Sequence, residues 1–310
     1  MTPLIVIAAM AMMIVGTTAT AQPTQDKVAR RIGDPAGTGR WPAVAEGFAD
    51  APGYTLYRPA TWPRERLPLV LWGNGGCRAN GLSASHFLRE IASHGYIVIA
   101  NGAPREEQPP LTALPNEDDA PAPAGPPPAK ADETQVSQML AAIDWAAQGI
   151  HRDHVDAQRI AVMGHSCGGL QALAAGADPR IDTVVAFNSG VYNRPGGGLS
   201  GVWITKDDLK KLHTPVAYIL GGPSDIAYPN GTDDVARLSH VPVFYANKDT
   251  GHGGTFSLVN GGDYGRVAVG WLDWQLKQDA GAAAMFVDAD CTLCQDPSWS
   301  IIRKQFPEQS

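Results

Sequence analysis

Short apolar runs alternate with segments of helical periodicity along most of this chain. The run Tyr96–Ala100 is almost continuously apolar, which is typical of a strand buried on both faces of a parallel sheet. The segment 82–94 before it carries apolar residues at helical spacing and stops at Gly95. Because parallel neighbours are joined by crossover helices, this alternation predicts βαβ units and a sheet covered by helices on both faces.

The same two patterns recur without any internal repeat. Strands are predicted at 54–57, 68–72, 96–100, 159–163, 183–187, 216–220 and 241–246. Helices are predicted at 82–94, 136–147, 167–176, 206–212, 231–239 and 263–278. We therefore expect one α/β domain over residues 22–285, with a sheet of about eight mostly parallel strands and no large cap domain. Residues 286–310 are expected to form a C-terminal tail.

Two segments break the pattern. Leu4–Val15 is an uncharged apolar run followed by Ala19-Thr20-Ala21, which predicts a signal peptide over 1–21 and export to a periplasm or the medium, with no membrane contact in the mature form. An uncleaved membrane anchor is the alternative. Residues 103–130 are rich in Pro, Ala and acidic residues and predict a surface insertion, either the rim of a site or a plain solvent loop.

Charge and cysteines narrow the function classes. The net charge is -7 and no cluster of Lys and Arg occurs, which argues against binding to nucleic acid or an anionic membrane. In an oxidising compartment, four cysteines predict two disulfides. Cys291-x-x-Cys294 also resembles a redox or zinc motif, but no His or second Cys pair lies nearby and the segment is polar. We favour a structural disulfide there, and expect no metal and no cofactor.

The sequence Gly164-His165-Ser166-Cys167-Gly168 lies between a predicted strand and a predicted helix. In a Gly-x-Ser-x-Gly turn of this kind the serine hydroxyl is held above the sheet, and the glycines allow close backbone approach. An ordinary tight turn or a phosphate-binding turn is the competing interpretation. We predict that Ser166 is a nucleophile.

A neutral serine needs a general base, which in turn needs an orienting carboxylate. His252 follows the predicted strand 241–246 in a Gly-rich loop, whereas His213 and His240 are less suited by position. Asp225 follows the strand 216–220, at the strand end where catalytic groups collect. A purely structural role as a turn cap is the alternative for Asp225, and Asp249 is the second candidate for the acid. The order Ser166, Asp225, His252 predicts a catalytic triad.

Acyl transfer also requires donors for an oxyanion. One is expected from the backbone N–H of Cys167, the residue after the nucleophile. The other is expected from Gly76 in the Gly-rich loop after strand 68–72, with Gly75 and Cys77 as alternatives. If these two segments meet, Cys77 and Cys167 are close enough to form a disulfide. The alternative is a pair of buried free thiols.

Taken together, Asn74-Gly75-Gly76, Gly164-His165-Ser166-Cys167-Gly168-Gly169, Asp225 and Gly251-His252-Gly253 resemble the α/β-hydrolase superfamily over roughly residues 50–278. The motif is similar to those of dienelactone-hydrolase-like, chlorophyllase-like and cutinase-like esterases, although Asn74 replaces the usual oxyanion-loop His. The resemblance implies an α/β-hydrolase domain with an open site. It also implies that Ile226, beside the acid, lines an acyl pocket.

These features lead to an expected activity. A secreted serine esterase acting on small or polymeric esters fits best. A peptidase of the prolyl-oligopeptidase-like type and a non-catalytic binding protein with the same fold remain alternatives. Tyr192 and Trp203 follow predicted strands and are candidates for aromatic walls around the substrate, although each is equally suited to packing on the scaffold.

Overall fold

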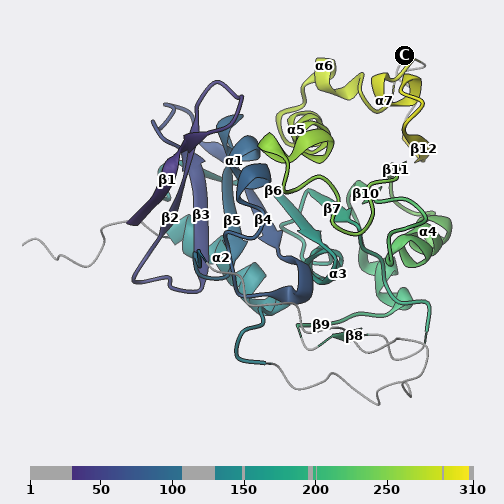
Figure 1. Ribbon diagram of the computed structural model, residues 1–310, viewed down its shortest axis with the longest axis horizontal. Coiled ribbons are helices and arrows are strands. Elements are labelled where there is room, and N and C mark those ends of the chain that lie inside the picture. Colours follow the sequence, from purple (N-terminus) through teal and green to yellow (C-terminus); the bar gives the residue numbers. More distant parts are fainter. Residues whose placement is uncertain are drawn as a thin grey trace, which may run out of the picture.

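The computed structural model describes residues 30–106, 130–148, 151–194, 198–199, 201–287 and 290–306. The predicted signal peptide, over 1–21, and most of the Pro-rich insertion lie outside the described residues. An α/β architecture with a large, mostly parallel sheet is confirmed, and Figure 1 shows this sheet running through the middle of the molecule.

Six parallel strands form the centre of the sheet. In spatial order they are β5 (Ile97–Asn101), β4 (Leu67–Gly73), β6 (Val155–His165), β7 (Thr183–Phe187), β10 (Val216–Leu220) and β11 (Val243–Asn247). β4, β5, β7 and β10 are buried at every position, as their apolar runs predicted. Since the strands run the same way, their carboxyl ends meet at one edge, where a site can be assembled from several loops.

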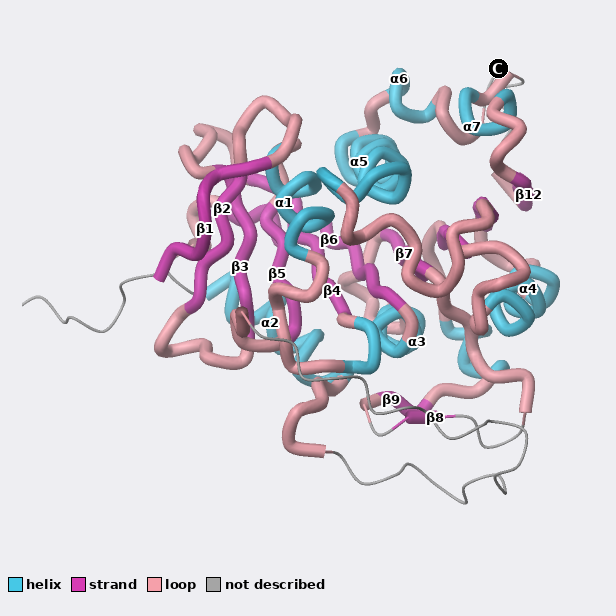
Figure 2. The backbone as a smooth tube through the Cα atoms, viewed as in Figure 1, coloured by secondary structure: helices cyan, strands magenta, loops and turns pink. Residues whose placement is uncertain are grey.

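The sheet has ten strands and is mixed, so the expectation of about eight was wrong. The antiparallel additions are β1 (Arg30–Ala36), β2 (Ala43–Gly47) and β3 (Tyr54–Pro59) on one side and β12 (Ser300–Lys304) on the other. Figure 2 shows β1 and β12 at opposite ends of the sheet. Most described positions of these two strands are solvent-exposed, so neither needs the apolar pattern by which strands are recognised.

Helices cover both faces of the sheet. Leu69 and Leu71 of β4 enter one core layer, and Val70 and Trp72 enter the other, as the period of two requires. The first layer is closed by α2 (Val136–Gln148), α3 (Cys167–Ala175) and α4 (Tyr228–Arg237). The second is closed by α1 (Ser85–Ser93) and α5 (Gly262–Lys277). The segment predicted as a short helix at 206–212 is a 3-10 helix, η3 (Lys206–Lys211).

The C-terminal segment packs against the second layer. It contains α6 (Ala280–Ala283) and α7 (Thr292–Gln295), and the predicted disulfide Cys291–Cys294 is confirmed. Trp299 is buried, and β12 then pairs with β11, so part of the predicted tail belongs to the sheet. No helix among the described residues has the length and apolar character needed to span a membrane.

Candidate active site

Ser166 occupies a sharp turn between β6 and α3. Its φ is 53°, in the left-handed region that side chains rarely adopt, and its N–H donates to the carbonyl of Phe187 on β7 at 3.0 Å. A Cβ added to Gly164 would lie 2.1 Å from the carbonyl oxygen of Gly168, and one added to Gly168 would lie 2.1 Å from the backbone of Gly73. The motif therefore needs both glycines, because the end of β4 and the start of α3 meet at this turn.

Three side chains from three strand ends form a continuous hydrogen-bonded chain. His252 Nε2 lies 2.9 Å from Ser166 Oγ, and His252 Nδ1 lies 2.6 Å from Asp225 Oδ1. Ser166 follows β6, Asp225 follows β10 and His252 follows β11, so the structure brings the predicted triad together. In this arrangement Nδ1–H donates to the carboxylate, which leaves Nε2 free to accept the proton of the serine hydroxyl.

Asp225 is buried and held from three sides. Its carboxylate accepts hydrogen bonds from the backbone N–H groups of Gly221 and Ala227, at 3.1 and 2.9 Å, in addition to that from His252. Burial alone would raise the pKa of Asp225, but these hydrogen bonds outweigh it and lower the pKa below its ordinary value. The carboxylate is therefore ionised and fixed in orientation, as an acid that orients a histidine must be.

The two predicted oxyanion donors lie beside Ser166. Gly76 in η2 (Gly75–Cys77) and Cys167 at the start of α3 both line the cleft that exposes the serine hydroxyl. As a first-turn residue, Cys167 has an N–H with no acceptor inside its helix. Within the described part of the chain, neither this N–H nor that of Gly76 donates to another group. Both are thus available to a ligand oxygen.

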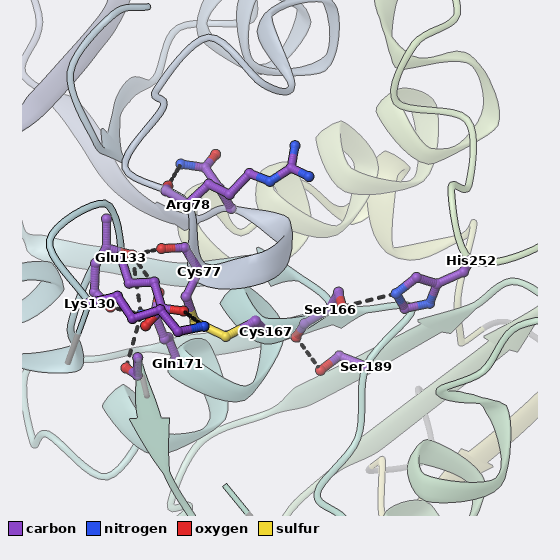
Figure 3. Close-up of a disulfide and its surroundings, with 12 residues drawn as sticks. Cys77, Arg78, Lys130, Glu133, Ser166, Cys167, Gln171, Ser189 and His252 are labelled. Atoms are coloured by element: carbon purple, nitrogen blue, oxygen red, sulfur yellow. Dashed lines mark hydrogen bonds and ion pairs between the residues drawn. A yellow bond between two sulfur atoms is a disulfide. The ribbon is translucent and has the colours of Figure 1, made fainter. Parts of the chain in front are cut away.

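A disulfide joins these two donor segments. Figure 3 shows the bond between Cys77 and Cys167. Their Cα atoms lie 5.1 Å apart. Behind the bridge, the buried side chain of Gln171 donates to the carbonyl of Thr134 at 2.7 Å, and the N–H of Thr134 donates to the carbonyl of Cys77 at 2.7 Å. The loop that contains Gly76 is therefore attached to α3 both covalently and through a buried hydrogen-bond network.

The site opens into a cleft of about 770 Å³. Tyr192 and Ile226 line it, and the Ile226 side chain is 65% exposed next to the buried acid. Trp203, in β9 (Val202–Trp203), does not line this cleft, although Leu199 of its partner strand β8 (Gly198–Leu199) does. On the side of the disulfide away from His252, charged residues including Arg78 and Glu133 line the cleft (Figure 3).

Sequence reasoning missed several polar residues that support the site. Asn188 is buried directly after β7 and donates from Nδ2 to the carbonyls of Gly251 and His252 at 2.9 and 2.8 Å. Its position right after an apolar run was the available signal. For Gln171 the signal was a polar side chain in an Ala- and Leu-rich helix, four residues after Cys167. Neither local pattern reveals which distant carbonyl the side chain reaches.

Comparison with known proteins identifies no family for this chain. No protein-family model matches the chain, and no curated protein sequence matches it. Among the described residues, no group of three or more His, Cys, Asp or Glu is placed to hold a metal ion. The function must therefore be inferred from the arrangement of the side chains themselves.

Proposed function

We propose that this protein is a secreted serine esterase of the α/β-hydrolase superfamily, which hydrolyses carboxylic esters through an acyl-enzyme at Ser166. The observation that carries the proposal is the hydrogen-bonded chain from Asp225 through His252 to Ser166, with links of 2.6 and 2.9 Å. The positive φ of Ser166 supports the same chemistry, as do the N–H groups of Gly76 and Cys167, which donate to no other group among the described residues. Export is supported by the two disulfides, which persist in oxidising compartments.

The proposed reaction has two halves. Ser166 Oγ attacks the ester carbonyl carbon while His252 Nε2 takes the hydroxyl proton, and the N–H groups of Gly76 and Cys167 stabilise the oxyanion. The alcohol leaves with the proton from His252. A water molecule then gives a proton to His252 and attacks the acyl carbon. As the carboxylic acid leaves, His252 returns that proton to Ser166 Oγ, which restores the serine hydroxyl.

The test is a panel of p-nitrophenyl esters of increasing acyl length, with polymeric esters and aminoacyl anilides alongside. We expect wild type to hydrolyse esters, and Ser166→Ala to lower kcat/KM by about 10⁴- to 10⁶-fold. A fluorophosphonate probe should label wild type but not Ser166→Ala. Ser83→Ala is the matched control, because its hydroxyl lies in the same cleft but donates to the carbonyl of Asn80.

Each alternative has its own result in this panel. Faster hydrolysis of anilides than of esters would assign the site to a peptidase. An absence of both turnover and labelling in wild type would assign the fold to a binding protein. Ester hydrolysis that survives unchanged in Ser166→Ala would overturn the assignment of the nucleophile.

A further inference from the structure

The main chain of His252 is held by two side chains that the proposed reaction does not use. His165 Nε2 lies 2.7 Å from the carbonyl oxygen of His252, and Asn188 Nδ2 lies 2.8 Å from the same oxygen. A carbonyl only accepts, so the hydrogen of His165 is on Nε2. One carbonyl thus receives two donors, from the ends of β6 and β7.

Both donors are themselves held in place. The Oδ1 atom of Asn188 accepts from the hydroxyl of Tyr264 at 2.7 Å, which fixes the amide so that Nδ2 faces the loop. The ring of His165 packs on Phe256, with ring centroids 4.9 Å apart. Burial lowers the pKa of His165 to about 4. Above that pH the ring is neutral, with its one hydrogen on Nε2.

The backbone before His252 is anchored, because the N–H groups of Thr250 and Gly251 donate to the carbonyl of Gly221 at 3.0 and 2.7 Å. Among the described residues, His252 and Gly253 themselves make no backbone–backbone hydrogen bond. Gly251, Gly253 and Gly254 surround the base, and Gly251 and Gly254 adopt positive φ values of 68° and 55°. Asp225 restrains only the imidazole. A displacement of about 1 Å in a reacting group can lower a rate about 100-fold, so the position of this backbone matters for proton transfer.

We infer that His165 and Asn188 form a latch that positions His252 for proton transfer from Ser166. The inference rests on the proposed function, and both residues are positioning residues rather than catalytic ones. The two sequence neighbours of Ser166 then have complementary positioning roles. The side chain before the serine holds the loop of the base, and the side chain after it, Cys167, holds the oxyanion loop.

The main variant is His165→Leu, with His165→Gln as its matched control. Leu removes the donor, whereas the Gln side-chain amide places an N–H close to where Nε2 lies. We expect His165→Leu to lower kcat for a p-nitrophenyl ester about 10- to 100-fold with KM changed less than about threefold, and His165→Gln to recover most of that loss. If His165→Leu does not fold by circular dichroism, His165→Asn replaces it, because that amide is too short to reach the carbonyl.

A double-mutant cycle separates the latch from other roles of His165. In a His252→Ala background the latch has no base to position, so His165→Leu should cause no further loss of residual activity. A full additional loss there would overturn the latch and indicate a contact with the substrate or the oxyanion loop, as would a rise in KM with kcat unchanged. Failure of Gln to restore kcat would also overturn it.

Hydrogen exchange gives a readout that does not depend on turnover. Peptides spanning residues 249–256 should exchange faster in His165→Leu, and in Asn188→Asp, than in wild type or His165→Gln. Unchanged exchange in both variants would contradict the latch even if activity falls. If wild type hydrolyses no ester but the loop still loosens in these variants, the proposed function fails while the latch stands.

Discussion

At the scale of single residues, the proposed site depends on which of two aspartates contacts His252. Asp249 lies three residues before His252 in the sequence, whereas Asp225 lies 27 residues before it. Asp225 is buried and bonded to the imidazole, whereas Asp249 accepts a hydrogen bond from the hydroxyl of Ser224 at 2.9 Å. The burial that isolates Asp225 from water strengthens its interaction with the ring, and the bonds to its oxygens keep it charged.

Replacement of Asp225 by Asn should therefore disable the base without removing it. The amide cannot stabilise an imidazolium, and it favours the tautomer in which Nε2 carries the hydrogen and cannot accept one. We expect Asp225→Asn to lower kcat for p-nitrophenyl esters by about 10³- to 10⁴-fold. Asp249→Asn is the matched control and should stay within about threefold of wild type. Equal losses in the two variants would show that the acid has been wrongly assigned.

At the scale of elements, the Cys77–Cys167 disulfide connects η2 to the first turn of α3. These two elements carry the N–H groups assigned to the oxyanion, so their relative position sets the geometry of that pair of donors. Loss of one complete donor typically lowers turnover about 10²- to 10³-fold. Loosening the two segments should have a smaller effect, because the hydrogen bonds through Gln171 and Thr134 remain.

The two disulfides provide a matched comparison. We expect Cys77→Ser with Cys167→Ser to lower kcat about 10- to 100-fold with little change in KM, and to weaken a boronic acid inhibitor that mimics the tetrahedral intermediate by a similar factor. Cys291→Ser with Cys294→Ser should leave both quantities near wild type. All assays should run well below the unfolding midpoint of each variant. A loss of kcat with unchanged boronate affinity would argue against a role at the oxyanion.

At the scale of the whole molecule, buried ionisable groups link the stability of the fold to pH. Burial lowers the pKa of His165 to about 4 from its ordinary value of 6.5. Between these two values the unfolded chain binds a proton at this residue and the folded chain does not, so stability falls as the pH falls through this window. Burial acts in the opposite direction at Asp234, where it raises the pKa to about 6.

A variant isolates the contribution of the histidine. Between pH 6.5 and pH 4, the unfolding free energy of wild type should fall by on the order of 2 kcal/mol more than that of His165→Gln. This value is smaller than the full pKa shift would give, because the ring is only partly buried. Urea unfolding of both proteins at pH 7, 5.5 and 4.5 measures this difference, and the effect of Asp234 cancels because both proteins contain it. Parallel stability curves would show that His165 does not titrate differently on folding.

Much of the fold was predictable because its central strands are buried on both faces. Such strands must be apolar along their length, and β5 and β10 are examples. Edge strands such as β12 carry no such requirement and were missed. The proximity of Ser166, Asp225 and His252 was predictable because the chain order and the strand ends determine where these residues lie. The positions of the Asn188 and Trp203 side chains relative to the site were not predictable, because they depend on contacts between segments that are distant in the sequence.

The pairing of the four cysteines has a consequence for how the protein is made. Four cysteines allow three pairings. In the structure the first cysteine along the chain pairs with the second and the third pairs with the fourth, which gives Cys77–Cys167 and Cys291–Cys294. A chain that enters an oxidising compartment amino end first presents Cys77 and Cys167 before the second pair arrives. An oxidase that joins thiols in their order of arrival therefore produces the native pairing directly, with no wrong bond for an isomerase to correct.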